Sequence, residues 1–313
     1  MKKEEKKIKW LYEVAKLYYE EHFSQDEISD FLKVSRATVS RGLAEAEERG
    51  IVQITVIDRL GISDKIAQQI EKKYGLAKAI IAHAPYKRRD IIKKNIGREA
   101  AKYISEVIAD KRSVGIAWGT TLYEMVKCLR PMDIDNLDII ELTGSTGHIS
   151  SEFAASELAR IFAENFGARR FVLQAPALVS NVDIKNAMLL DKNISEVMEK
   201  GRNVDVAMIG IGSIDGESPV YKVLNLTESD IDEIIASNVV GDICFRFFDD
   251  KGNKVKLSFD ERIIGIELDD FKKIGTRIGI AGGENKIMLI KAALVGSLIN
   301  VLITDNFTAN ELL

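Results

Sequence analysis

The sequence contains few of the residues that form disulfide frameworks and metal sites. Its 313 residues include only two cysteines and three histidines. Cys128 and Cys244 have no paired spacing, which argues against a disulfide framework and a zinc site and fits a reducing cytosol. The histidines at positions 22, 83 and 148 are too scattered to predict a metal cluster. We therefore expect a cytoplasmic protein without a metal site.

Long apolar runs and an excess of positive charge are also missing. The N-terminus is rich in Lys and Glu and lacks the apolar segment of a signal peptide. No run of about 18 apolar residues is present, so we expect no transmembrane helix. The formal net charge is −4, so any binding of nucleic acid must be local to a basic patch. An acidic remainder would repel DNA and help to orient such a contact.

The most informative segment of the sequence is residues 24–41, which predicts a helix, a tight turn and a second helix. Ile28, Phe31 and Leu32 recur at helical spacing and predict one apolar face of the first helix. Ser24 can cap this helix, and Glu27 three residues later completes a capping box. The pattern therefore predicts a short amphipathic helix with a defined start.

The second helix of this pair has the composition of a helix that reads DNA. Ser35 can cap it, while Val39 and Leu43 point inward. Between residues 33 and 41 there are three positive charges and no negative charge. DNA phosphates attract cations, and base edges bind short hydroxyls and guanidinium groups near a helix N-terminus. The alternative is an ordinary solvated helix pair. The candidate DNA-binding residues are Gln25, Ser35, Arg36, Ala37, Thr38, Ser40 and Arg41.

The surrounding residues predict a small N-terminal domain. Residues 8–21 form an amphipathic pattern, and with helices over 25–32 and 35–49 they predict a three-helix unit. Gly50 ends the third helix, and the alternating residues 51–56 predict a strand that serves as a wing. We therefore predict a winged helix-turn-helix DNA-binding domain over residues 1–56 and a linker helix over residues 57–75.

From residue 76 to residue 313, short apolar strands alternate with amphipathic helices. This alternation predicts a mostly parallel sheet covered on both faces, in a doubly wound α/β domain. We assign effector binding to this domain, and the family resemblance described below implies that it also forms oligomer contacts. Such sheets bind ligands at the carboxyl ends of their strands. The predicted strands are 79–83, 113–117, 138–142, 170–174, 204–209, 262–266, 277–281 and 301–304, and the predicted helices are 97–109, 122–129, 151–166, 187–200, 228–236 and 286–295.

Glycine-rich loops with hydroxyl or charged side chains follow several of these strands, at residues 115–121, 142–148, 210–213 and 281–286. Such loops leave backbone N–H groups free just before a helix, a geometry that suits a phosphate or another anion. Glycine in a single turn of this kind has an ordinary steric explanation, but four such loops favour a small phosphorylated or polyhydroxy ligand. The candidate residues in these loops are Gly119, Thr120, Thr121, Thr143, Gly144, Ser145, Gly212 and Lys286.

None of these loops carries a nucleotide fingerprint. The segment that contains Gly210 and Gly212 lacks a third glycine, and no phosphate-binding Gly-x4-Gly-Lys-Ser/Thr run is present. Nucleotide hydrolysis and hydride transfer therefore lack support, and we expect no cofactor. Asp242 can hold sugar hydroxyls, and Lys286 can hold a phosphate, or form a Schiff base if its pKa is lowered. The alternative is that Asp242 caps a turn and Lys286 is a solvated residue of a first helical turn.

Taken together, these motifs resemble the SorC family of bacterial transcription regulators over nearly the whole chain. The resemblance depends on residues 35–41, 118–122, 142–144, 241–243, 265–266, 281–286 and 300–305, together with Gly252. Regulators of the deoxyribonucleoside type are most similar, through residues 118–121, 241–244, 246–249 and 251–253. The resemblance implies a helix-turn-helix domain, a phosphosugar-binding domain of the sugar-phosphate isomerase type, and a tetramer.

One position departs from this pattern. Deoxyribonucleoside regulators carry a Lys at the position that we match to Thr143, and this Lys forms a Schiff base with deoxyribose 5-phosphate. Thr143 cannot form an imine, so we expect the effector to bind non-covalently there. The effector is then deoxyribose 5-phosphate or another sugar phosphate. The resemblance also implies that Asp242 and Lys286 contact it.

The sequence thus predicts a regulator, most simply a repressor of a sugar or nucleoside catabolic operon, that binds double-stranded operator DNA and a phosphorylated sugar. The second interpretation is a sugar-phosphate isomerase or deaminase fused to a DNA-binding domain. Isomerisation needs a positioned base and a proton shuttle, and only His148 lies near a candidate loop, with no acid–histidine constellation around it. We therefore expect no enzyme. The third interpretation is a constitutive DNA-binding scaffold with a vestigial pocket.

Overall fold

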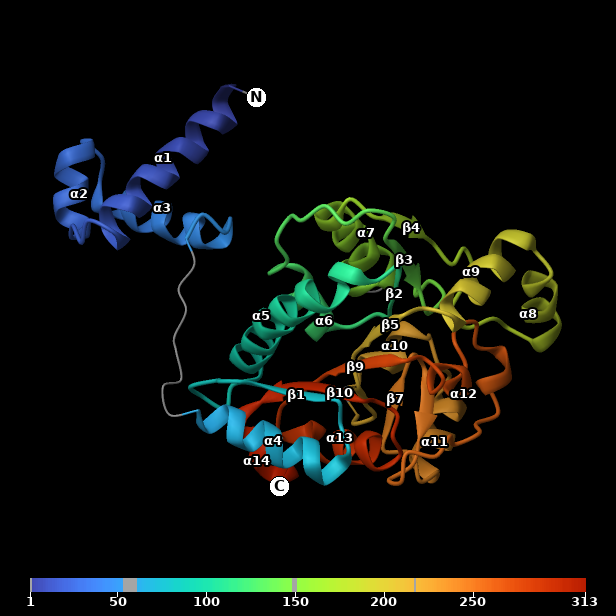
Figure 1. The fold of residues 1–313 in the computed structure, drawn as a ribbon. Helices are drawn as coiled ribbons and strands as arrows, with labels where there is room; N and C mark the ends of the chain where they lie inside the picture. Colours follow the sequence, from blue (N-terminus) through green and yellow to red (C-terminus); the bar gives the residue numbers. More distant parts are fainter. Residues whose placement is uncertain (1, 53–60, 148–150, 217) are drawn as a thin grey trace. The chain divides into compact units, whose positions relative to one another are not determined.

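The computed structural model describes residues 2–52, 61–147, 151–216 and 218–313. The chain divides into two compact units, Met1–Arg59 and Leu60–Leu313 (Figure 1). Each unit has its own hydrophobic core. No helix in the described part of the chain is long and apolar enough to cross a membrane.

The first unit consists of three helices, α1 (Lys2–Tyr19), α2 (Gln25–Leu32) and α3 (Arg36–Glu48). Ser24 and Glu27 form the predicted capping box at the start of α2. Ser35 caps α3 by accepting a bond from the backbone N–H of Thr38 at 3.1 Å. Lys33 joins the two helices with a left-handed φ of 54°, which turns the chain within three residues. The core of this unit comprises Leu11, Val14, Ile28, Val39 and Leu43.

One expectation for α2 is wrong, because Phe31 does not join the apolar face. Its exposed fraction is 65%, whereas Ile28 is fully buried and Leu32 packs against the core. At 3.6 residues per turn, Phe31 lies roughly 80° around the helix from the midline of Ile28 and Leu32. The small core of this three-helix unit covers only that narrow stripe. The wing predicted over residues 51–56 falls mostly on residues 53–56, outside those the structure describes; residues 51 and 52 form a bend.

The second unit is built on a seven-stranded, wholly parallel sheet in the order β1-β10-β9-β5-β2-β3-β4. The mostly parallel α/β fold predicted from the sequence is confirmed. The chain moves from β2 to one edge through β3 and β4, and returns on the other side of β2 through β5. The strand order therefore reverses between β2 and β5. The strands are β1 (Lys78–Ala82), β2 (Ser113–Ile116), β3 (Asp138–Glu141), β4 (Arg169–Phe171), β5 (Val206–Ile209), β9 (Thr276–Ile280) and β10 (Val301–Asp305).

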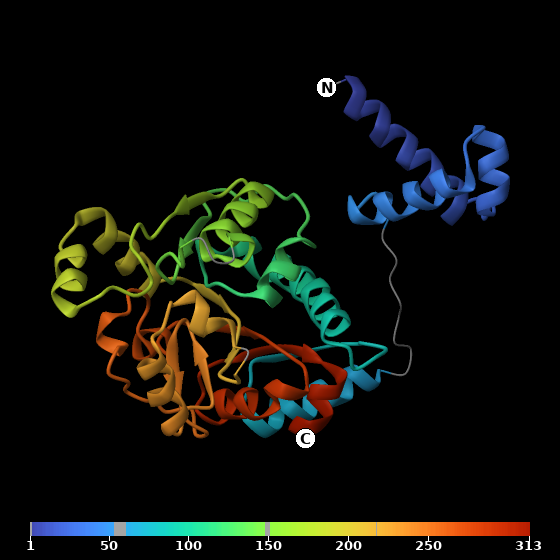
Figure 2. The same ribbon diagram turned by 180° about the vertical axis from the view of Figure 1, so that it is seen from behind.

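Helices cover both faces of this sheet (Figures 1 and 2). Along β5, Val206 and Met208 point into the core under α5, α6 and α7, whereas Ala207 and Ile209 point into the core shared with α4, α9, α13 and α14. This alternation is what a central strand buried on both sides requires. The helices of this unit are α4 (Ile62–Tyr74), α5 (Arg89–Val107), α6 (Thr120–Val126), α7 (Ala155–Phe166), α8 (Val182–Leu189), α9 (Lys192–Arg202), α10 (Pro219–Val223), α11 (Glu228–Ala236), α12 (Leu268–Phe271), α13 (Ile287–Val295) and α14 (Asn306–Leu312), with short 3₁₀ turns at Ile108–Asp110, Ser151–Phe153, Asp260–Arg262 and Glu284–Lys286.

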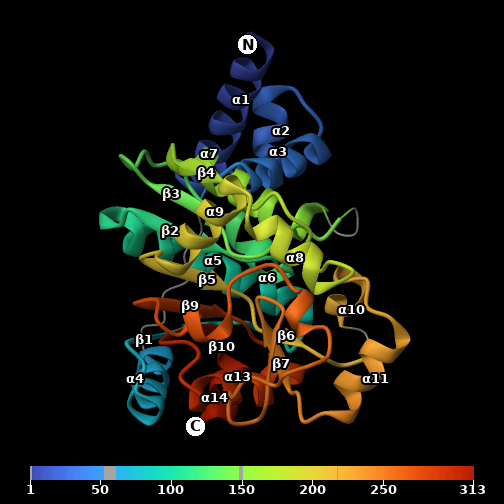
Figure 3. The same cartoon turned by 90° about the vertical axis from the view of Figure 1, so that its right-hand side faces the viewer.

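A second, antiparallel sheet lies beside the first and was not predicted. It consists of β6 (Gly212–Ser213), β7 (Gly241–Ile243) and β8 (Arg246–Phe248), and Figure 3 shows it near α10 and α11. Cys244 and Phe245 form the turn between β7 and β8, both with left-handed φ, of 53° and 64°. Hairpin turns of this kind usually carry Asn or Gly, so neither residue signals the turn in the sequence.

Other predicted elements also differ from the structure. The helix predicted over residues 97–109 begins earlier, at Arg89, and ends at Val107. The helix predicted over residues 187–200 is two helices, α8 and α9, because Asp191 accepts bonds from the N–H groups of Asn193 and Ile194 and caps a new start. The strand predicted over residues 262–266 is an irregular segment with isolated bridges only, Ile263 to Leu178 and Gly265 to Thr143. The apolar residues of this segment are buried because the segment packs over the end of the sheet, although it does not form a strand of it.

Candidate functional site

A pocket lies at the carboxyl edge of the main sheet, where the strand order reverses between β2 and β5. Loops that diverge at such a point leave a crevice, the usual ligand site of an open α/β sheet. The pocket is bordered by the loops after β2, β5 and β9, the first turns of α5 and the β7–β8 hairpin. The lining residues are Arg89, Lys93, Ala117, Trp118, Gly119, Thr120, Thr121, Gly210, Ile211, Gly212, Ser213, Ser218, Pro219, Asp242, Cys244 and Lys286.

Asp242 brings a buried carboxylate into this pocket. Its exposed fraction is 2%, and the backbone N–H of Phe245 donates to Oδ2 at 3.2 Å. Its other oxygen, Oδ1, has no hydrogen-bond partner among the described residues. Burial raises the pKa of Asp242 to about 6, against the opposing effects of the Phe245 N–H and the Lys286 charge. Leaving a buried acceptor without a partner costs free energy, so Oδ1 is suited to accept a hydrogen bond from a ligand hydroxyl.

Lys286 reaches the same pocket from the turn before α13. Its Nζ donates to the backbone oxygen of Ile211. Burial lowers the pKa of the Lys286 amine to about 8; the charge of Lys93 lowers it further, and Asp242 opposes the shift. At neutral pH the amine is therefore still mostly protonated. A cation next to an acceptor fits a ligand that carries both a negative group and hydroxyls.

Two further cations line the pocket, and the sequence interpretation missed them. Arg89 and Lys93 lie on one face of α5, four residues apart, at its start. Lys93 donates to Oγ1 of Thr120 at 2.7 Å. Its pKa is lowered by burial first and by the charge of Arg89 second. The sequence does contain a pattern that could have indicated them, Arg-x-x-x-Lys after a strand. A helix start rich in cations, however, usually indicates a face exposed to solvent.

The Gly119–Thr121 loop lines the pocket, although not through a free amide of Gly119. That N–H donates to the backbone oxygen of Phe153 at 3.0 Å. Gly119 has a φ of +151°, and α6 begins directly after it at Thr120. Similarly, the N–H of Gly283 donates to the side chains of Asp305 and Thr308. The expectation that these two glycines present free N–H groups is wrong, because the fold already uses them.

Thr143, Gly144 and Ser145 do not line the pocket. The N–H of Gly144 donates to Ile264 at 3.0 Å, and that of Ser145 donates to Ala175 at 2.7 Å. The predicted free amides of this loop are therefore also wrong. The physical reason is that β3 lies on the far side of β2 from the crevice, where residues 262–266 cover its end. Thr143 is 1% exposed, and its Oγ1 has no partner among the described residues.

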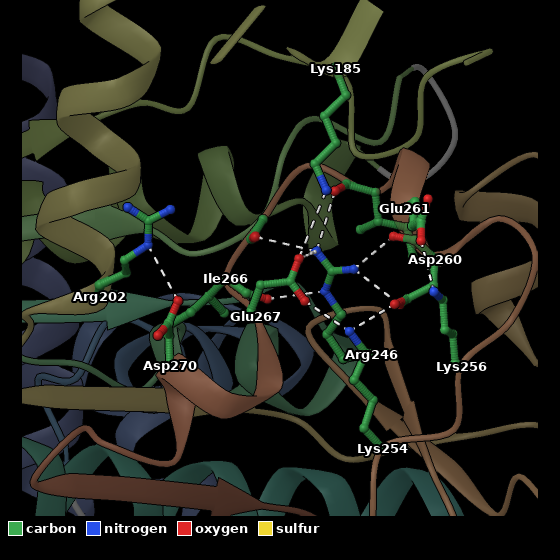
Figure 4. Close-up of polar contacts among 12 residues, drawn as sticks. Lys185, Arg202, Arg246, Lys254, Lys256, Asp260, Glu261, Ile266, Glu267 and Asp270 are labelled. Carbon is green, nitrogen blue, oxygen red and sulfur yellow. Dashed lines mark hydrogen bonds and ion pairs between the residues drawn. The ribbon is translucent and has the colours of Figure 1, made fainter. Parts of the chain in front are cut away.

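The β7–β8 hairpin that carries Asp242 is held by a buried arginine (Figure 4). Arg246 is 1% exposed and forms ion pairs with Asp260 at 3.0 Å and Glu267 at 2.8 Å. It also donates to the backbone oxygens of Ile263 and Ile266. These bonds tie the end of the hairpin to the 260–267 segment and fix the turn before it. On the pocket side of that turn, Phe245 stacks on the ring of Trp118, with centroids 5.3 Å apart.

The exposed surface of α3 forms a separate candidate site in the N-terminal unit. Ser35, Arg36, Ala37, Ser40 and Arg41 are exposed, while Gln25 and Thr38 are partly buried. Val39 is fully buried, as predicted for the inward face. Arg36 forms a 3.5 Å ion pair with Asp26 in which both side chains are exposed, and Arg41 donates to the backbone oxygen of Ala37. Exposed pairs of this kind contribute little, so both guanidinium groups can rearrange to meet DNA.

The chain is similar to a group of transcription regulators over nearly its whole length. The Sugar-bind family model, which describes a sugar-binding domain, matches residues 58–313. The deoxyribonucleoside regulator of Bacillus subtilis (strain 168) is 34% identical over 300 residues, which are 96% of each chain. The chain belongs to the SorC family. The sorbitol operon regulator of Klebsiella pneumoniae, also in this family, is 29% identical over 310 residues, 98% of each chain.

Solved structures of SorC-type regulators have the same fold. Full-length SorC from Klebsiella pneumoniae matches with a TM-score of 0.78 at 28% identity, over 97% of this chain and 98% of that one. A DeoR family regulator from Listeria monocytogenes matches with a TM-score of 0.75 at 28% identity, over 80% of this chain and 99% of that one. The predicted family is confirmed, and transcription regulation is favoured over the enzyme interpretation. His148, on which that alternative depended, lies outside the described residues.

Proposed function

We propose that this SorC-family chain represses a sugar or nucleoside catabolic operon and that a phosphorylated sugar in the pocket controls its affinity for the operator. The observation that carries the proposal is the Asp242–Lys286 pair beside the Gly119–Thr121 loop. It places a protonated amine and a buried acceptor, which has no partner in the described part of the chain, in one crevice. Asp242 binds sugar hydroxyls, with Gly212 beside it, while Thr120, Thr121 and Lys286 bind the phosphorylated end. Thr143, Gly144 and Ser145 have no direct role in this proposal.

The proposed effector binds without a covalent bond. Thr143 has no amine, so a Schiff base cannot form at that position. The amine in the pocket that needs testing is that of Lys286, since its pKa of about 8 leaves some neutral amine at neutral pH. Borohydride treatment with deoxyribose 5-phosphate, followed by mass spectrometry, should therefore show no added mass. A reduced sugar adduct on Lys286 would overturn the non-covalent mode and leave the regulator proposal intact.

The proposed DNA contact is made by α3 and the residues around it. Arg36 and Arg41 contribute positive charge, and Ser35, Thr38 and Ser40 contribute hydroxyls. Ala37 leaves room for a base edge, and Gln25 lies at the start of α2. Helices of this kind read a half-site in the major groove, and a repressor pairs half-sites through oligomer symmetry. A cytoplasmic homotetramer on double-stranded operator DNA is therefore part of the proposal.

The deciding experiment combines an operator fragment with a panel of sugar phosphates. We expect one member of the panel to change the affinity for the operator, measured by fluorescence anisotropy. The unphosphorylated form of the same sugar should have little effect. If every sugar phosphate left DNA binding unchanged, and none stabilised the protein against heat, a constitutive DNA-binding scaffold would replace the proposal. Turnover of a sugar phosphate to a product would favour the isomerase or deaminase alternative.

A further inference from the structure

We propose that the outward face of α8, formed by Ile184, Ala187 and Leu190, binds the same face of a second copy of this chain. The contact is an antiparallel pair of α8 helices related by a two-fold axis near Ala187. The proposed function requires a symmetric oligomer but names no surface that forms it. The inference supplies such a surface, and it does not depend on the identity of the effector or of the operator.

The first observation is that α8 is apolar and yet stays at the surface. Five of its eight residues are apolar, but none of the eight is buried. The exposed fraction is 38% for Ile184 and 86% for Leu190, which directly follows the helix, and Ala187 between them is also exposed. Figures 1 and 2 show α8 at the outer end of this unit. Apolar side chains gathered on one exposed face usually mark an interaction site.

The opposite side of α8 holds the helix in place. Met188 and Leu189 pack against the hydrophobic core of the unit, and Lys185 forms an ion pair with Glu267 at 3.8 Å (Figure 4). Asn181 caps the helix by accepting a bond from a backbone N–H of its first turn at 2.9 Å. The outward face is therefore in position before a partner binds, so that association orders few groups.

The spacing of the exposed residues makes this face complementary to itself. Ile184 and Leu190 lie three residues to either side of Ala187, so all three share one side of the helix. An antiparallel second copy places its Leu190 against Ile184 and its Ala187 against Ala187. The small side chain at the crossing point lets the two helices approach closely. A two-fold contact requires such a match of one patch with itself.

The charges around the patch also favour a second copy. Asp183 is exposed in the first turn of α8, and Lys192 is exposed just beyond its end. Antiparallel pairing brings each Asp183 towards Lys192 of the second copy, at the rim of the apolar centre. Asp191 lies beside Lys192, but its carboxylate accepts bonds from two backbone N–H groups at the start of α9, which stabilise its charge. An anionic lipid surface, by contrast, would be repelled by Asp183 and Asp191.

The first test measures the mass of the full-length protein by light scattering and sedimentation velocity across micromolar concentrations. Leu190→Asp should lower the mass to about half of the wild-type value or less, because loss of a two-fold contact divides a symmetric oligomer. The matched control is Asn186→Asp, which adds the same charge at an exposed position roughly 100° around α8 from Ala187 and should keep the wild-type mass. The midpoint of thermal unfolding should not change in Leu190→Asp, because that side chain is already exposed.

The second test places a cysteine at the proposed two-fold axis. Cys128 is exposed, so it is first replaced by Ser to remove background cross-linking. Ala187→Cys should then form a disulfide between two copies under mild oxidation, since a disulfide needs Cα atoms within about 7 Å. Asn186→Cys is the control, and it should give several-fold less covalent dimer because its side chain points away from the axis.

A wild-type protein that is monomeric at every concentration would overturn the inference, and so would Leu190→Asp protein with the wild-type mass. Equal cross-linking through positions 186 and 187 would also exclude the proposed pairing. A monomeric wild type that bound lipid vesicles, with binding lost in Leu190→Asp, would assign this face to a membrane surface instead. The proposed function is judged separately, by the effect of sugar phosphates on operator affinity. If that effect were present while Leu190→Asp kept the wild-type mass, the regulator proposal would stand and this interface would not.

Discussion

Gly212 and Asp242 face each other across the β6–β7 pair so closely that a Cβ atom at position 212 would lie 1.9 Å from Oδ1 of Asp242. Any side chain at this position must displace the carboxylate. Oδ1 is also the oxygen that has no partner among the described residues. The absence of a side chain at position 212 therefore keeps the acceptor of the pocket in place.

The first prediction is that Gly212→Ala weakens effector binding at least tenfold, about 1.4 kcal/mol, because the methyl group pushes Asp242 out of position. The matched control is Gly210→Ala, which lines the same pocket and whose added Cβ would meet nothing closer than 3.9 Å. Titration of the effector into both variants checks this. Equal loss of affinity in the two variants would show that bulk in the pocket, and not the position of Asp242, is responsible.

The second prediction concerns Lys286→Ala. Removing a charge-assisted bond costs roughly 1.5–3 kcal/mol, so effector affinity should fall about ten- to hundredfold. Binding of DNA without effector should persist, since α3 belongs to a unit with a separate core. Lys291→Ala, an exposed lysine of α13, provides the control. An unchanged effector affinity in Lys286→Ala would remove this amine from the site.

The third prediction concerns DNA. Arg36→Ala or Arg41→Ala should weaken operator binding by roughly 1–3 kcal/mol if the side chain reads a base. The free energy of unfolding should change little, because both side chains are exposed and lie away from Val39 and Leu43. Anisotropy titrations at several salt concentrations measure the effect, with Lys16→Ala on α1 as the control. Two arginine variants with wild-type affinity would exclude α3 as the reading helix.

The fourth prediction is a pH dependence of stability that comes from Asp242. The pKa of Asp242 is raised from 3.8 to about 6 in the folded protein, so the folded state favours the protonated carboxyl. Its contribution to the free energy of unfolding is therefore fully present below pH 4 and is lost as the pH rises towards 6. A difference of about two pKa units corresponds to a contribution on the order of 3 kcal/mol. Asp242→Asn should remove this slope and raise the free energy of unfolding at pH 7, while it weakens effector binding. Denaturant titrations between pH 4 and pH 7 would show whether the slope is absent in the variant.

The fifth prediction is a tetramer in solution. One short reading helix contacts too few bases for high specificity, so paired half-sites require a symmetric oligomer. Light scattering at micromolar concentration should give about four times the mass of one chain, with and without operator DNA. A monomer under both conditions would contradict the proposed assembly.

Local patterns allowed the helix pair and most of the sheet to be predicted from the sequence. The capping box of α2, the N-cap of α3 and the spacing of Val39 and Leu43 involve residues within one or two turns, so their outcome depends little on the rest of the chain. Alternation of buried strands with helices likewise gave the parallel sheet. The prediction that Phe31 is buried was wrong, because helical spacing does not indicate how wide a stripe of the helix the small core can cover.

The pocket was only partly predictable, because its residues meet through the order of the strands. The loops after β2 and β5 come together since those strands are neighbours where the order reverses. The loop with Thr143 has the same composition but follows β3, on the other side of β2. Arg89 and Lys93 precede those loops in the chain and carry no motif, and Cys244 and Phe245 form a hairpin turn without the usual residues.

The amides of Gly119, Gly144, Ser145 and Gly283 are all bonded within the protein. Of these residues only Gly119 lines the pocket, so one backbone donor of the pocket is already used by the fold and the charged side chains carry much of the recognition. A few substitutions among Arg89, Lys93, Asp242 and Lys286 can then change the molecule that is sensed while the sheet keeps its form. Such an architecture allows one scaffold to acquire new inducers, both in evolution and in the engineering of biosensors.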